Sequence, residues 1–255
     1  PFRGWWEIMR ARFPAIIRRE YSLFLLAALA FLAGALFGFI ASLAAPETRE
    51  ILVPGDHLAQ SPAERVRHLE ELERSGHSRV EGLSSHSAFT TFLFTHNIRV
   101  TCLGFVLGFT LGIGTIIILF VNGAILGALA AWYYEEHVMT FFLGWVGPHG
   151  AIEIPCVLFG CVAGLMIARA QFRKDEGTFL SQLKRLRGDM TDILVGTATL
   201  LVLAGIVEGG FSQINEPTLP YFLKIGVAAV LFVALMAYLF VLKRRSEPAT
   251  PPAVR

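Results

Sequence analysis

The stretch that decides the fold runs from His96 to Arg169 and reads HNIRVTCLGFVLGFTLGIGTIIILFVNGAILGALAAWYYEEHVMTFFLGWVGPHGAIEIPCVLFGCVAGLMIAR. It is almost wholly apolar, which is typical of segments that cross a bilayer. Polar groups interrupt it at Asn122-Gly123, at Glu135-Glu136-His137 and in residues 148–155, which read PHGAIEIP. Because polar groups are costly in lipid, these interruptions are candidate functional or helix-breaking positions.

The composition places the whole chain in a membrane. Of its 255 residues, 54% are hydrophobic and 16% are charged, and the mean hydropathy is +0.57. Soluble domains carry about 25% charged residues, so this chain is depleted in charge. The net charge of +2 and the absence of a recognisable motif predict no nucleic-acid partner. Its three cysteines form no CxxC pair, which argues against a disulfide framework or a zinc ribbon, and we expect no cofactor.

The hydrophobic runs predict an all-α bundle of about six spans. The first is 21–45, and the last two are 193–207 and 221–242. The uncharged run 100–134 would be about 52 Å long as one helix, so the chain must bend within it. We expect broken or re-entrant segments in this central part, including the short 141–146, with breaks at Asn122, Gly123, Pro148, Gly150 and Pro155.

Seven segments follow from this pattern. They are an interfacial segment 1–20, the first span 21–45, an extracytoplasmic cap 46–87, the membrane core 88–170, a connector 171–190, the last spans 191–242 and a tail 243–255. Within the cap, Ser61-Pro62-Ala63-Glu64 is typical of a helix start. The chain begins with Pro rather than Met, and the sequence leaves open whether further residues precede it.

The distribution of basic residues predicts the orientation. Fifteen of the 22 lie in the N-terminal segment, in residues 169–189 and in the tail, whereas residues 46–99 hold six basic and eight acidic residues. By the positive-inside rule both termini are then cytoplasmic, which requires an even number of spans.

With this orientation all seven histidines lie on the outer side. Glu153 follows His149 by one helical turn, so the two share a face. A polar cluster in the outer part of the membrane is therefore expected, composed of His149, Glu153, Glu208, Asn122, Asn97 and Arg99. It is either a functional site or a set of locally paired groups, and the sequence leaves both open.

A metal site is a further alternative. His149 and Glu153 could ligate zinc, with His137 as a third ligand, as in an intramembrane metallopeptidase. However, Thr140 stands where the arginine of the prenyl-protein proteases is expected, and the HExxH pattern is missing. Zinc or pH sensing by the loop histidines is also open.

Glycines spaced four apart predict close helix contacts. The pairs and triplets are Gly34/Gly38, Gly104/Gly108/Gly112, Gly123/Gly127 and Gly160/Gly164. Such spacing lets helix backbones approach, either within one bundle or across a homodimer.

Four segments resemble the stage II sporulation protein M family of bacterial and archaeal membrane proteins. They are Asn97–Val100, Leu119–Gly123 with Leu126-Gly127, Pro148–Pro155 with Ala163–Leu165, and Ile206–Phe211, within about residues 90–215. The resemblance implies a multi-spanning protein of a prokaryotic inner membrane, without known enzymatic activity. It also implies envelope-remodelling partners, since the family's namesake anchors a complex with peptidoglycan hydrolases.

We therefore expect a non-enzymatic membrane scaffold for envelope remodelling, with membrane lipids around it and the cap as its docking part. The competing hypothesis is a transporter or channel for a small solute or lipid. Its polar path would be formed by the break at Asn122 and the cluster of His149, Glu153 and Glu208.

Overall fold

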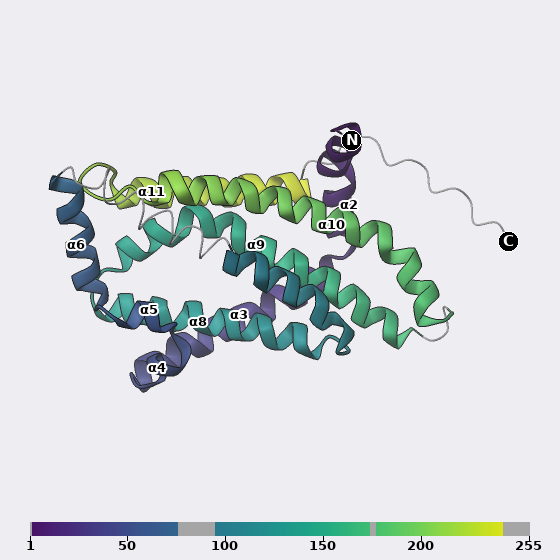
Figure 1. The fold of residues 1–255 in the computed structure, drawn as a ribbon, viewed down its shortest axis with the longest axis horizontal. Coiled ribbons are helices and arrows are strands. Elements are labelled where there is room, and N and C mark those ends of the chain that lie inside the picture. Colours follow the sequence, from purple (N-terminus) through teal and green to yellow (C-terminus); the bar gives the residue numbers. More distant parts are fainter. Residues whose placement is uncertain (1, 76–94, 174–176, 242–255) are drawn as a thin grey trace.

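The computed structural model describes residues 2–75, 95–173 and 177–241, and every regular element in these ranges is a helix. Figure 1 shows long helices lying side by side along one axis, with α6 across one end and α2 near the other. The predicted all-α membrane bundle is confirmed.

Five helices in the described residues are long and apolar enough to cross a membrane. They are α3 (Tyr21–Ala44), α8 (Ile113–Glu135), α9 (Met139–Phe172), α10 (Phe179–Val207) with its π-helical extension η5 (Glu208–Ser212), and α11 (Tyr221–Met236) with η6 (Ala237–Val241). A shorter helical segment, 95–106, leads through η3 (Leu107–Phe109) into α8.

Short helices occupy the two ends of the bundle. The N-terminal elements α1 (Phe2–Glu7), η1 (Ile8–Arg12) and α2 (Phe13–Arg19) mark what we call the basic end. The elements α4 (Thr48–Leu52), α5 (Gly55–Leu58) and α6 (Pro62–Ser75) mark the cap end. The predicted helix start in the cap is confirmed, because the backbone nitrogen of Ser61 donates to Glu64 Oε2 over 3.1 Å and that of Glu64 donates to Ser61 Oγ over 3.3 Å.

The helix directions fit an even number of crossings. Gly34 and Gly38 approach Phe120 and Ala124 in the same order, so α3 and α8 are parallel. The chain must therefore return between them. Residues 95–109 run from mid-depth, where Asn97 meets Glu153, toward the basic end, because Gly104 and Gly108 meet Cys161 and Gly164 in the same order. At the basic end, the Arg18 guanidinium donates to the carbonyl oxygen of Leu239 over 2.7 Å, and Tyr238 donates to that of Met9. The N-terminal helices and the end of the last span thus lie on one side.

The expected break at Asn122-Gly123 is wrong. Helix α8 is continuous through both residues, because the Asn122 amide donates to the carbonyl oxygen of Ile118 one turn earlier, over 2.7 Å. The chain turns earlier instead, where Leu111 and Gly112 have positive φ of 57° and 82°. Glycine adopts this left-handed conformation readily, which explains the position of the turn.

The expected breaks at Pro148, Gly150 and Pro155 are also wrong, and residues 141–146 are not re-entrant. All belong to the single 34-residue helix α9. It is the central helix, because 89% of the residues in its most apolar 18-residue stretch are buried in the protein. Prolines are tolerated in such a helix because neighbouring elements can satisfy the freed backbone groups.

The glycine pairs form contacts within one chain. A Cβ atom on Gly38 would lie 2.0 Å from the carbonyl oxygen of Ala124, and one on Gly127 would lie 1.9 Å from that of Ala35. The second set joins 95–109 to α9, where a Cβ on Gly108 would lie 2.1 Å from the carbonyl oxygen of Gly164. Gly34 and Gly123 meet backbone carbonyl groups in the same way, whereas the nearest atoms to Gly104, Gly112 and Gly160 belong to side chains of the neighbouring helix. This packing accounts for the glycines, and the homodimer stays a prediction.

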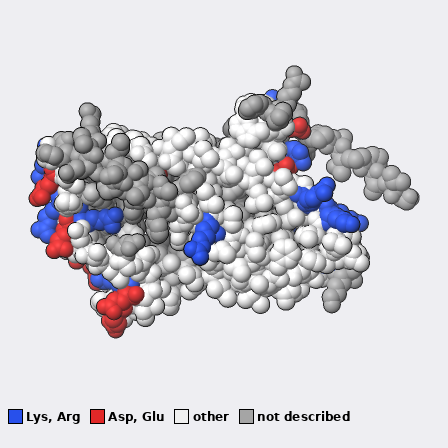
Figure 2. All heavy atoms as spheres, viewed as in Figure 1, with Lys and Arg blue, Asp and Glu red and all other residues white. Residues whose placement is uncertain are grey.

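The surface has the polarity of a membrane protein. Figure 2 shows charged side chains gathered at the two ends and a mostly uncharged band between them, interrupted by a basic group. Large apolar side chains are exposed along the helices, among them Leu32 at 61% and Ile206 at 68%. A band of this kind is what a bilayer would cover.

Candidate functional site

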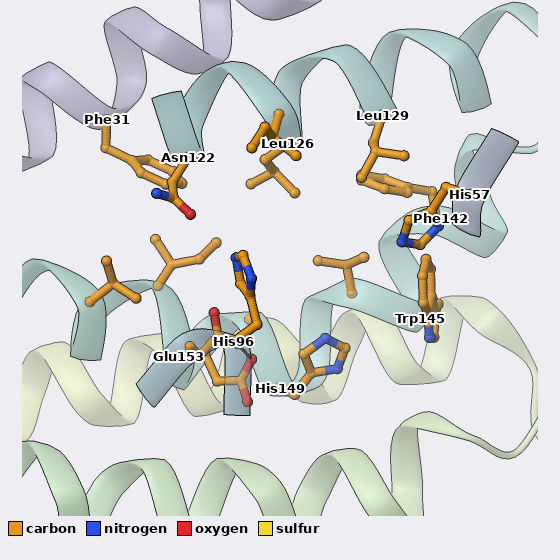
Figure 3. A pocket seen from close by; sticks show the side chains of 16 residues that line it. Phe31, His57, His96, Asn122, Leu126, Leu129, Phe142, Trp145, His149 and Glu153 are labelled. Carbon is orange, nitrogen blue, oxygen red and sulfur yellow. Dashed lines mark hydrogen bonds between the residues drawn. The ribbon is translucent and has the colours of Figure 1, made fainter. Parts of the chain in front are cut away.

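A pocket of about 160 Å³ lies within the bundle, between the 95–106 segment, α8 and α9. Most of its lining is apolar. Figure 3 shows Asn122, Leu126 and Leu129 on one side and His96, His149 and Glu153 on the other. Its polar lining residues are His57, His96, Asn97, Asn122, His149 and Glu153.

Glu153 is the acidic residue of the pocket, and it is 3% exposed. Its Oε2 accepts a hydrogen bond from the Asn97 amide over 2.5 Å, while its Oε1 has no hydrogen-bond partner in the described residues. Asn97 comes from the 95–106 segment, so that helix and α9 are tied at this point. Glu153 therefore has a free acceptor atom in a buried environment.

His149, one turn before Glu153, is 5% exposed. Its Nδ1 lies 3.2 Å from the hydroxyl oxygen of Ser212 on η5. Lys224 on α11 is fully buried, and its Nζ donates to the carbonyl oxygens of Ser212 and Ile214 over 2.8 and 2.9 Å. The hydroxyl and carbonyl groups of Ser212 thus connect a histidine and a lysine behind the pocket.

Glu208 lies beside this network rather than on the pocket. It is fully buried at the start of η5, and neither carboxyl oxygen has a hydrogen-bond partner in the described residues. It lies within electrostatic range of Glu153. An ionised carboxylate buried at that position would need a charged or hydrogen-bonding partner. Glu208 also begins a π-helical turn, and such turns occur often at functional sites.

The depth of Glu153 follows from helix geometry. It comes 16 residues before Arg169, near the basic end of α9, and 14 residues after Met139, where α9 begins. At 1.5 Å per residue these separations are about 24 and 21 Å. Asn122, nine residues into α8, lies at about 14 Å from its start. Both side chains are therefore near the middle of the bundle.

The chain was then compared with known proteins. The family model of stage II sporulation protein M matches residues 27–213. The chain belongs to this family. No curated protein and no solved structure matches the chain.

All six predicted polar residues lie within the matched range, and the structure brings five of them together and separates the sixth. Asn97, Asn122, His149 and Glu153 line one pocket, and Glu208 lies behind it. Arg99 is exposed and is not among the lining residues. It lies two positions from Asn97 on the same helix, so the two side chains point in different directions.

Three polar residues near the site were not identified from the sequence. His57 reaches the pocket from the cap, where its Nδ1 lies 3.2 Å from an Arg65 nitrogen. Ser212 and Lys224 complete the network behind the pocket. Lys224 had a recognisable signal, because it is the only charged residue in the predicted span 221–242, but it lies beyond the range matched to the family.

The hypothesis of a metal site has no support from the geometry of the described residues. In residues 2–75, 95–173 and 177–241, no three His, Cys, Asp or Glu side chains come together as a metal site requires. His77 and His86 lie outside the described residues.

Proposed function

We propose that this protein binds a small cationic or hydrogen-bond-donating solute in the central pocket and passes it through the membrane. The observation that supports this proposal is the free Oε1 of Glu153, buried at mid-depth on a pocket wall. A carboxylate at that depth is costly, and such residues are typical of ion and substrate paths.

The chemistry of the lining favours a donor as ligand. Glu153 Oε1 can only accept hydrogen bonds when it is ionised, and the Asn122 amide nitrogen is already used within α8. The Asn122 carbonyl oxygen then remains as a second acceptor. A volume of about 160 Å³ corresponds to roughly five water molecules, so the solute would be small.

Thiol labelling tests whether the pocket is open to water and selects cations. In a variant with Cys102→Ser, which removes the exposed native cysteine, Leu126→Cys places a thiol on the pocket wall. We expect 2-aminoethyl methanethiosulfonate to react about tenfold faster than the anionic 2-sulfonatoethyl reagent, corrected for their rates with a free thiol. Glu153→Gln should abolish the preference, whereas Glu47→Gln at an exposed position should not. No labelling, or no charge preference, would contradict the proposal.

Methylammonium uptake into proteoliposomes then tests passage. We expect uptake above that of empty liposomes, reduced by Glu153→Gln and unchanged by Glu47→Gln. Labelling without uptake would restrict the proposal to a solute-binding protein.

The orientation is part of this proposal. The basic end carries Arg12, Arg19, Arg169 and Arg185, whereas the cap end mixes both charges. By the positive-inside rule we place the basic end in the cytoplasm and the cap outside, in a prokaryotic inner membrane.

A scaffold role is the second candidate, and one observation favours it. Ile51 on α4 is 83% exposed at the cap end, which also carries the charged helix α6. Membership of the family supports a membrane anchor for envelope-remodelling partners. A photocrosslinker at Ile51, but not at lipid-exposed Ile206, should then capture a peptidoglycan hydrolase, and Glu153→Gln should leave that capture intact.

A further inference from the structure

Two buried carboxyl groups face each other behind the central pocket. Helices α9 and α10 lie side by side and are joined by the short connection 173–178, so they run in opposite directions (Figure 1). Where η5 continues α10, the Ser212 hydroxyl oxygen lies 3.2 Å from His149 Nδ1 on α9. Glu208 precedes Ser212 by four residues, and Glu153 follows His149 by four. Equal steps in antiparallel helices end at opposite positions, so Glu208 lies against Glu153, in agreement with the electrostatic interaction between them.

Neither carboxyl group has a cationic partner in the part of the chain that the structure describes. Glu208 is fully buried, and neither of its oxygens accepts a hydrogen bond there. Glu153 is 3% exposed and accepts a hydrogen bond from the Asn97 amide on Oε2 alone. Lys224 is nearby on α11, but its Nζ donates to two backbone carbonyl oxygens instead. The pair therefore carries unsatisfied acceptor atoms with no fixed positive charge bound to them.

Few other charged or titratable groups surround the pair. Helix α10 has no charged residue between Asp192 and Glu208, and α3 has none along its length. No lysine or arginine is among the residues that line the pocket. The other polar side chains on the pocket wall are two amides and three histidines: Asn97, Asn122, His57, His96 and His149. A cation that enters the pocket would thus meet no lysine or arginine on its wall.

Two carboxyl groups in this arrangement depend on each other for their charge. Each negative charge disfavours the other, and burial without a hydrogen bond adds to this effect. The protons of such a pair are lost in linked steps that belong to both groups. A positive charge bound at Glu153 Oε1 would offset the repulsion, so a proton could then leave.

We propose that Glu153 and Glu208 form a proton-binding pair that exchanges one proton for one solute cation. This inference rests on the proposed function, because the cation occupies the solute-binding Oε1 of Glu153. When the cation binds, one proton leaves the pair for water, so the net charge in the pocket is unchanged. When the cation leaves, a proton returns. Passage of the cation through the membrane is thereby coupled to proton movement in the opposite direction.

Isothermal titration calorimetry of the full chain with methylammonium tests the exchange. The binding curve gives the affinity, and its repetition in buffers of different ionisation enthalpy gives the number of protons released. We expect about one proton per cation near neutral pH. Because the coupling is reciprocal, methylammonium should bind about tenfold more tightly for each unit by which the pH rises, until the pair has lost that proton.

Replacing Glu208 distinguishes a coupled pair from a single carboxyl group. Without the neighbouring charge Glu153 ionises more readily, so in Glu208→Gln the number of protons released should fall about threefold or more near neutral pH. Methylammonium should still bind, because Glu153 is unaltered. Glu208→Met, which removes the carboxyl group but keeps an unbranched side chain, should give the same result. Glu47→Gln, at an exposed position, should change neither binding nor proton release.

The outcomes separate the exchange from the proposed function. If methylammonium binds without proton release, the exchange is wrong and solute binding stands. The same holds if the unaltered chain and both Glu208 variants release equal numbers of protons. If the unaltered chain does not bind methylammonium at all, both the exchange and the proposed function are wrong.

Discussion

Replacing Gly38 by alanine should loosen the contact between α3 and α8. The added Cβ would lie 2.0 Å from the carbonyl oxygen of Ala124, about 1 Å closer than real Cβ atoms come, so the helices must separate. Overpacking costs about 1–3 kcal/mol. The obstructing atom belongs to the backbone and cannot rotate away, so we take the upper end of that range.

Alanine also favours the helix by about 1 kcal/mol over glycine. The net destabilisation is therefore about 2 kcal/mol, the difference between the two effects. For a chain of this size this corresponds to a fall in Tm of about 4–8 °C. Tryptophan fluorescence during a thermal scan in detergent would measure it.

Gly226 provides the matched control. It lies in the apolar part of α11, and a Cβ there would meet no atom within 4 Å. Gly226→Ala should leave Tm unchanged or raise it slightly, because only the helix preference changes. Equal shifts for Gly38→Ala and Gly226→Ala would show that close backbone approach is not what stabilises the α3–α8 pair.

Three further predictions concern polar groups. Burial alone would raise the pKa of Glu20, but the hydrogen bond and charge of Arg169 outweigh it and hold the pKa below its usual value. The ionised Glu20 therefore stabilises the fold fully at pH values above the usual pKa of a glutamate, and this stabilisation is lost as pH falls through the lowered pKa of the folded protein. In the Glu20→Gln variant, Tm should then fall less steeply at acid pH than in the unaltered chain. Lys224→Met should cost about 1–3 kcal/mol in the same thermal scan, because two buried carbonyl groups lose their donor. Ser61→Ala should destabilise α6 by about 1 kcal/mol, seen as faster hydrogen exchange in that helix alone.

The fold was largely predictable, because the length of the apolar segments and the distribution of charged residues indicate where membrane spans lie. The sequence placed α3 and α11 close to where they are. Helix α10, however, begins at Phe179, 14 residues before the predicted span 193–207, and the turn within 100–134 was misplaced. Asn-Gly is a common turn pair in water, where the backbone can bond to solvent. In α8 the Asn122 side chain bonds to its own helix and Gly123 makes room for the carbonyl oxygen of Phe31, so neither ends the helix.

The candidate site was predictable where its residues follow one another along a helix. Glu153 and His149 share a face of α9, which their spacing predicts. The contributions of Asn97, His57 and Ser212 depend on which helices become neighbours, and spacing does not encode that. Arg99 was misassigned to the cluster for the same reason, since its neighbour Asn97 points to Glu153 and Arg99 does not.

The parallel arrangement of α3 and α8 has a consequence for how the protein is made. In the most apolar 18-residue stretch of α3, only 22% of the residues are buried in the protein. Its close glycine contacts are to α8. The end of α8 lies 91 residues beyond the end of α3. At about 5–20 residues per second, the ribosome needs roughly 5–18 s to synthesise that interval. During this time the first helix has lipid in place of its partner. Packing of α3 must therefore wait for α8, and any factor that shields unpaired helices during insertion would act on α3 first.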